Sequence, residues 1–134
     1  MTVGDRARIL VVDDSASMRR SLAEILTRAE HEVIQAADGA EASRISRDAD
    51  VHLVILDLFM PVKDGIETLR ELRARAPGIP IIAISGGGAD DTGVDLLKAA
   101  VLLGAVQSIE KPFIPAVLLE AVRQALRGGT QGLA

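Results

Sequence analysis

The residues Leu53-Val54-Ile55-Leu56-Asp57 give the clearest indication of the fold, because four consecutive aliphatic residues lead directly into a carboxylate. A short apolar run without alternation is typical of a strand that is buried on both faces of a parallel sheet. The stretch Ile9-Leu10-Val11-Val12 has the same character and is also followed by acidic residues. Both stretches therefore predict buried strands with polar side chains at their carboxyl ends.

Short apolar runs alternate with helical patterns along the rest of the chain. Met18, Leu22 and Leu26, for example, recur at helical spacing and form one apolar stripe. Five strand–helix repeats without a hairpin signal predict an α/β fold, a parallel sheet with helices on both faces. The predicted strands cover 9–12, 32–36, 53–56, 79–84 and 105–109, and the predicted helices roughly 18–29, 40–45, 64–72, 92–103 and 114–126. The glycine-rich tail 128–134 is interpreted either as a frayed end or as the start of a linker to a further domain.

The composition is that of one globular domain of 134 residues, of which 49% are hydrophobic and 25% charged. No apolar run approaches the ~18 residues of a membrane-spanning helix, and the first residues lack a secretory signal, so we expect a cytoplasmic protein without a membrane partner.

The absence of cysteine excludes disulfides and thiolate metal sites. The net charge is −4 and the basic residues are scattered, which argues against nucleic acid as a partner. The one adjacent basic pair, Arg19-Arg20, is interpreted as part of a solvated helix face.

Polar residues gather at the carboxyl ends of the predicted strands. Asp13 and Asp14 follow the first strand, Asp57 the third, Ser85 the fourth and Lys111 the fifth. In open parallel sheets ligands bind outside these strand ends, where the strand order reverses. We therefore expect these side chains to form a single site.

Three carboxylates at one edge repel one another and need a cation. Like charges about 4 Å apart repel by roughly 1 to 4 kcal/mol at effective dielectrics between that of water and that of a protein surface. Oxygen ligands without histidine or cysteine favour Mg²⁺, which also binds phosphate oxygens. A carboxylate nucleophile, a metal, an ammonium and a hydroxyl together are the components of phosphoryl transfer.

Each of these residues also has a simpler interpretation when it is taken alone. One of the two residues Asp13 and Asp14 would cap the following helix, and Ser85 would be a cap or a loop hydroxyl. Lys111 alone would be an ordinary surface lysine before a turn. The functional interpretation therefore depends on their convergence.

Four segments of the chain resemble the signature blocks of bacterial two-component response-regulator receiver domains. They occur in the family's order, each at the end of a predicted strand, and the resemblance covers about residues 7–127. It implies a single receiver domain over 1–134 with the flavodoxin-like (CheY-like) doubly wound sheet, strand order 2-1-3-4-5. The segments are Val11-Val12-Asp13-Asp14-Ser15, Leu56-Asp57-Leu58-Phe59-Met60-Pro61 with Asp64-Gly65, Ile84-Ser85-Gly86 and Glu110-Lys111-Pro112-Phe113.

The resemblance assigns a role to the acidic residues. Asp57 would be the phosphoacceptor. Asp13 and Asp14 would hold Mg²⁺ together with the Asp57 carboxylate and the backbone carbonyl of Phe59. The phosphoryl group would come from a sensor histidine kinase or a histidine phosphotransfer protein.

The resemblance also assigns the switch residues and the partners. Ser85 would be the hydroxyl that moves onto the phosphoryl group. Lys111 would pair first with Asp57 and then with the phosphoryl oxygens, and the Lys111–Pro112 bond would be cis. The domain would signal to a downstream protein as a monomer or weak dimer, and it would catalyse only its own phosphorylation and dephosphorylation. Leu96, Val101 and Leu103 are candidates for the output surface.

Two positions depart from the family pattern. Ser108 stands where an aromatic residue usually reports phosphorylation, so the output surface signals differently or the neighbouring loop alone does the switching. Phe59 either limits water access to the phosphoryl group or is a harmless apolar residue. The stretch Gly86-Gly87-Gly88 is interpreted as a switch loop, because no nucleotide-binding pattern follows it.

Three rival functions remain open. A flavin carrier of similar topology would need aromatic residues, which make up only 1% of this chain. A free-standing metal-dependent phosphohydrolase would need a general acid or base, and His31 and His52 are both poorly placed for that role, so we expect them to be structural or solvent-facing. A degenerate receiver would bind partners without phosphorylation.

Overall fold

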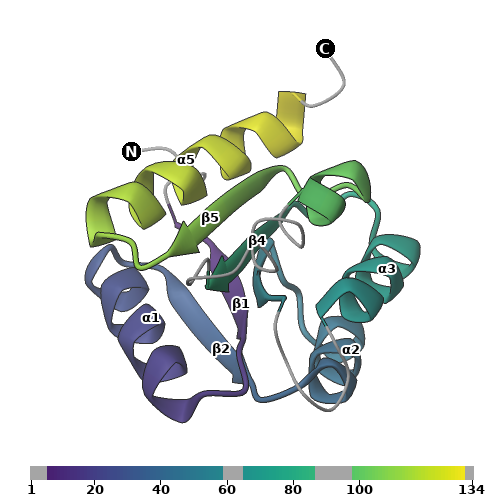
Figure 1. Ribbon diagram of the computed structural model, residues 1–134, viewed down its shortest axis with the longest axis horizontal. Coiled ribbons are helices and arrows are strands. Elements are labelled where there is room, and N and C mark those ends of the chain that lie inside the picture. Colours follow the sequence, from purple (N-terminus) through teal and green to yellow (C-terminus); the bar gives the residue numbers. More distant parts are fainter. Residues whose placement is uncertain (1–5, 59–64, 87–97, 132–134) are drawn as a thin grey trace.

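A five-stranded parallel sheet in the order β2-β1-β3-β4-β5 forms the centre of the molecule (Figure 1). The computed structural model describes residues 6–58, 65–86 and 98–131. The predicted doubly wound sheet and its strand order are confirmed. The elements are β1 (Arg8–Val12), α1 (Ala16–Arg28), β2 (Glu32–Ala36), α2 (Gly39–Asp48), β3 (Leu53–Asp57), α3 (Gly65–Arg75), β4 (Ile81–Gly86), β5 (Gln107–Lys111) and α5 (Pro115–Gln131).

The sheet divides the apolar interior into two clusters. One face packs against α1 and α5, through residues such as Leu22 and Leu118. The other face packs against α2, α3 and the helical residues 98–102, through residues such as Leu69 and Ala100. Figure 1 shows α1 and α5 on one side of the strands and α2 and α3 on the other. Because successive strand residues point to opposite faces, each central strand contributes to both clusters.

Side-chain caps fix the start of the first two helices. The Ser15 hydroxyl accepts a hydrogen bond from the Met18 N–H at 3.2 Å, so Ser15 caps α1 rather than Asp13 or Asp14. Asp38 caps α2. Its carboxylate accepts from the Glu41 N–H, while the Glu41 carboxylate accepts from the Ala37 N–H.

Two predicted strands are displaced by two residues. We predicted strands at 79–84 and 105–109, whereas β4 spans Ile81–Gly86 and β5 spans Gln107–Lys111. The cause is the pairing of the two strands, in which Ile82 lies opposite Gln107 and Gly86 opposite Lys111. An edge strand carries polar residues, so apolar content alone does not mark its limits.

The last helix is longer than predicted. We expected a frayed end or a linker from residue 128, whereas α5 continues to Gln131. Pro115 is its first residue, where a missing N–H is tolerated. Of the helix predicted at 92–103, residues 98–102 are helical and the preceding part lies outside the described residues. Asp64 of the signature block also lies outside them.

Candidate functional site

The carboxyl edge of the sheet brings the predicted residues together. Asp13 immediately follows β1 and Asp57 ends β3, and these strands are neighbours in the sheet. Ser85 is the penultimate residue of β4, and Lys111 is the last residue of β5. The sequence placed Ser85 and Lys111 after their strands, whereas both lie inside them.

Three carboxylates form a cluster at this edge. Asp13, Asp14 and Asp57 each offer an oxygen, and the three oxygens lie within 4.8 Å of one another. Asp13 and Asp57 are buried, while Asp14 is exposed. An all-oxygen set with one open side fits Mg²⁺, which keeps several waters and takes few protein carboxylates. The donor set therefore fits the metal that the sequence predicts.

Lys111 shares its charge between two of these carboxylates. Its Nζ lies 3.5 Å from Oδ2 of Asp13 and 3.8 Å from Oδ1 of Asp57. The lysine side chain is 22% exposed, and the two acidic side chains are 2% and 6% exposed. One ammonium faces three carboxylates, so the cluster keeps an excess of negative charge that favours a divalent cation.

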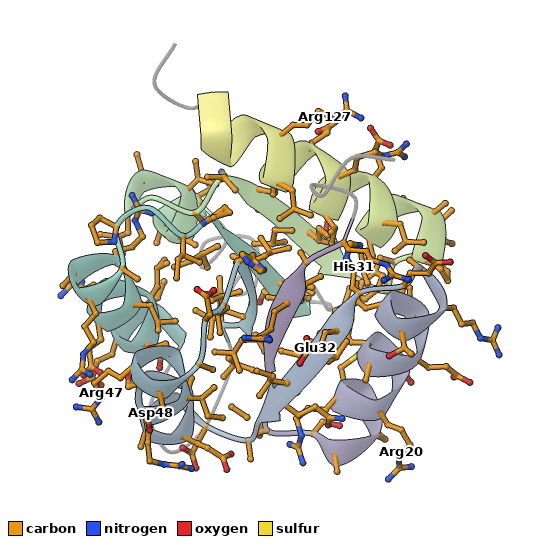
Figure 2. The ribbon with its side chains drawn as sticks, turned by 180° about the vertical axis from the view of Figure 1, so that it is seen from behind. Arg20, His31, Glu32, Arg47, Asp48 and Arg127 are labelled. Atoms are coloured by element: carbon orange, nitrogen blue, oxygen red, sulfur yellow. The ribbon has the colours of Figure 1, made fainter. Side chains whose placement is uncertain are left out.

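Asp13 is fixed by several backbone contacts. Its N–H donates to the Ala36 carbonyl at 3.1 Å, and its Oδ1 accepts from the Ser15 N–H at 2.9 Å. Its own carbonyl accepts from Nη1 of Arg19 at 2.7 Å. The prediction of a solvated Arg19-Arg20 face is therefore wrong for Arg19, which is partly buried, and right for Arg20, which is exposed and points away from α1 in Figure 2.

The sequence of this chain matches a known family over the same residues. The model of the response regulator receiver domain matches residues 9–123. The chain belongs to the response-regulator receiver domain family. These domains are signalling modules of two-component systems, so the flavin-carrier and free-standing phosphohydrolase alternatives are set aside.

Relatives of this receiver domain include both short and longer proteins. The chemotaxis protein CheY of Thermotoga maritima is 35% identical, with 87% of this chain and 95% of that protein covered. The probable transcriptional regulator ycf27 of Porphyridium aerugineum is 40% identical over 91% of this chain but only 49% of its own length. The chain thus spans about half the length of the first curated relatives it matches.

Solved structures share the architecture. The receiver domain of NtrX from Brucella abortus superposes with a TM-score of 0.83 and 34% identity, covering 89% of this chain and 98% of that one. The fold and the family therefore agree. Among residues 6–58, 65–86 and 98–131, none of the helices has both the length and the apolar character needed to span a bilayer.

Ser85 of this receiver domain is buried, and its hydroxyl has no hydrogen-bond partner among the described residues. A buried hydroxyl without a partner costs free energy, because it has lost its hydrogen bonds to water. The position of Ser85 in the strand beside β3 therefore suits the switch role that the family resemblance implies.

Gly65 brings the start of α3 against the end of β3. A Cβ at Gly65 would lie 2.2 Å from Cα of Leu58 and 2.7 Å from the carbonyl oxygen of Asp57. The Gly65 N–H donates to the Leu58 carbonyl at 3.0 Å. Only glycine permits this approach, so the glycine of the signature block shapes the backbone beside Asp57. Phe59, the predicted carbonyl ligand, lies outside the described residues.

Two further expectations concern β5 and the bond that follows it. The Lys111–Pro112 bond is cis, as the resemblance implied. Ser108 is exposed on β5.

The Nδ1 atoms of His31 and His52 accept hydrogen bonds from the N–H groups of residues 7 and 8, at the amino end of the sheet (Figure 2 for His31). Both histidines are therefore structural, as predicted.

Proposed function

We propose that Asp57 accepts a phosphoryl group from a phosphohistidine of a sensor histidine kinase or a histidine phosphotransfer protein. The observation that carries this proposal is the position of one nearly buried carboxylate, Asp57, beside both an ammonium and two further carboxylates. A downstream protein reads the phosphorylated state. The domain is thus a receiver that catalyses only its own modification and its own reset.

The reaction is an in-line displacement at phosphorus. A carboxylate oxygen of Asp57 forms a bond to phosphorus while the P–N bond to the donor histidine breaks, and the electron pair returns to the imidazole, which is then protonated by solvent. Lys111 holds Asp57 in place and then donates to a phosphoryl oxygen, since its Nζ is already 3.8 Å from the attacking carboxylate. Positioning and charge neutralisation supply most of the catalysis.

The acidic cluster has a separate task in this reaction. Asp13, Asp14 and Asp57, with the backbone carbonyl of Phe59, would hold Mg²⁺, which when bound neutralises charge on the phosphoryl oxygens. Asp13 keeps its orientation through the Ser15 N–H and through Lys111. Hydrolysis of the acyl phosphate by water resets the domain and regenerates the Asp57 carboxylate.

The signal arises from the charge that phosphorylation adds at Asp57. A phosphoryl group adds about two negative charges and three acceptor oxygens. The buried Ser85 hydroxyl donates to one of these oxygens and draws the end of β4 toward the site. Moving a two-state equilibrium from mostly off to mostly on requires about 5.5 kcal/mol of differential interaction, a quantity that a few charge-assisted hydrogen bonds supply.

Exposed apolar residues near β5 are the candidate output surface. Val101 is 50% exposed and Leu102 is 87% exposed, so this end of the 98–102 helix is open to a partner protein. Leu103, which we had also considered, instead packs against the core. Leu96 lies outside the described residues.

The decisive experiment is incubation with acetyl phosphate and Mg²⁺, followed by intact-mass measurement. We expect the gain of one phosphate by the wild-type domain, its loss in Asp57→Asn, and its retention in the matched control Asp50→Asn at the opposite end of the sheet. Addition of a chelator should prevent the modification. Absence of the added phosphate in the wild type, with a phosphohistidine donor also failing, would establish the degenerate receiver instead.

A further inference from the structure

Arg19 fastens the acidic turn to the first turn of α1. Its Nη1 donates to the main-chain carbonyl of Asp13 at 2.7 Å, a short charge-assisted hydrogen bond. Its backbone N–H donates to the Ser15 carbonyl at 2.9 Å. Arg19 therefore contacts the turn through both its main chain and its side chain.

The contact fixes the residue that presents carboxylate oxygens to the cluster. Asp13 lies just beyond the last residue of β1, where the pairing of this strand with β2 and β3 ends. Its N–H is held by Ala36 and its Oδ1 by the Ser15 N–H, so the Arg19 contact to its carbonyl is a further restraint on the same residue. Together these contacts set the orientation of the peptide that leads into Asp14.

We propose that Arg19 is a positioning residue for the divalent cation, an inference that rests on the proposed function. Its guanidinium does not serve as a ligand, because it carries no acceptor atom. It acts through Asp13, by holding the main chain so that the carboxylates of Asp13 and Asp14 converge with that of Asp57.

Because Arg19 is positively charged, the direction in which its replacement changes the Mg²⁺ affinity tests the proposal. A positive charge near a cation site weakens cation binding, so removal of the charge alone should tighten it. Removal of the positioning contact should weaken it, and loss of a group that orients a metal ligand typically lowers metal affinity by about 10- to 100-fold. The two effects have opposite signs, and we expect the loss of positioning to dominate.

The test compares Arg19→Met with the matched control Arg20→Met. Both variants lose one positive charge from adjacent positions of α1, but Arg20 is exposed and extends into solvent (Figure 2). Mg²⁺ alone is titrated into each protein and followed by the backbone amide shifts of residues 13–15 and 57. We expect about tenfold weaker Mg²⁺ binding in Arg19→Met, and binding within about twofold of the wild type in Arg20→Met.

A second variant and a second measurement distinguish positioning from general loss of structure. Arg19→Lys keeps the charge but has neither the reach nor the planar fork of arginine, so its Mg²⁺ affinity should also fall, by a smaller factor. In both Arg19 variants the rate of modification by acetyl phosphate should recover at saturating Mg²⁺, which a misfolded domain would not do.

The outcomes separate the two proposals. Mg²⁺ affinity in Arg19→Met equal to or tighter than that of Arg20→Met, or an unchanged affinity in Arg19→Lys, would overturn the positioning role while leaving the proposed function intact. A wild-type domain without saturable Mg²⁺ binding would overturn the metal-dependent function itself, and the inference with it.

Discussion

Replacement of Asp14 by asparagine should have opposite effects on stability in the absence and in the presence of Mg²⁺. The Asp14 carboxylate shares a 4.8 Å cluster with those of Asp13 and Asp57, and the single ammonium of Lys111 contacts only the latter two. Without a cation, the folded state therefore contains repulsion that the unfolded chain relieves. Neutralising Asp14 removes part of this repulsion and leaves the two lysine contacts in place.

The size of the effect follows from the distance between the carboxylate oxygens of the cluster. At 4.8 Å, the upper limit of the separations between these oxygens, two unit charges repel by about 0.9 kcal/mol in water and by about 3.5 kcal/mol at an effective dielectric of 20. Asp14 is exposed, and Lys111 offsets part of the repulsion, so a net gain of about 1 kcal/mol is expected for the Mg²⁺-free variant. Mg²⁺ at ten times its dissociation constant stabilises the wild-type protein by about 1.4 kcal/mol, whereas the variant should gain little.

Urea unfolding measures both effects when it is followed by far-UV circular dichroism, which is needed because the chain contains no tryptophan or tyrosine. Asp50→Asn at the amino end of the sheet removes the same charge far from the cluster. Its free energy of unfolding should lie within about 0.5 kcal/mol of the wild-type value, both without and with Mg²⁺. Two results would refute the electrostatic reasoning. One is an Asp14→Asn variant that is less stable than the wild type without Mg²⁺. The other is an Asp14→Asn variant that Mg²⁺ stabilises as strongly as it stabilises the wild type.

Two further substitutions test the backbone and the hydroxyl of the site, each by the same unfolding measurement. Gly65→Ala should lose about 3 kcal/mol or more, because the new Cβ would meet backbone atoms at 2.2 and 2.7 Å, whereas Gly78→Ala, with nothing within 4 Å, should be neutral or gain up to about 1 kcal/mol. Equal losses in the two alanine variants would contradict the close approach at Gly65. Ser85→Ala should stabilise the Mg²⁺-free domain by about 1 kcal/mol, because it removes a buried hydroxyl without a partner among the described residues. A clear loss of stability in that variant would show that the hydroxyl is already satisfied.

Much of the site was predictable because strand polarity alone determines where the chemistry lies. Once the runs before Asp13 and Asp57 are read as parallel buried strands, their carboxyl ends must share an edge. The same reasoning found Ser85 and Lys111, although it placed both beyond their strands. Strand limits were harder to predict, since β5 is an edge strand whose pairing with β4 extends over polar residues.

The orientation of a helix relative to the adjoining loop was not predictable from residue type. Arg19 and Arg20 are adjacent and chemically equivalent, yet one holds the acidic turn and the other extends into solvent. The distinction depends on the entry angle of α1, which the Ser15 cap fixes. The spacing from Ser15 to Arg19 is four residues, about one helical turn, and this spacing is the signal that would have found the contact.

The division of the interior by the sheet has a consequence for how this domain changes over evolution. The cluster under α1 and α5 and the cluster under α2, α3 and residues 98–102 have no residue in common. Side chains in one cluster can therefore change without direct loss of contacts in the other, while the opposite cluster still anchors the strands. The strands that lead to Asp13 and Asp57 pack into both clusters, so each cluster by itself restrains the edge of the sheet that carries the carboxylates.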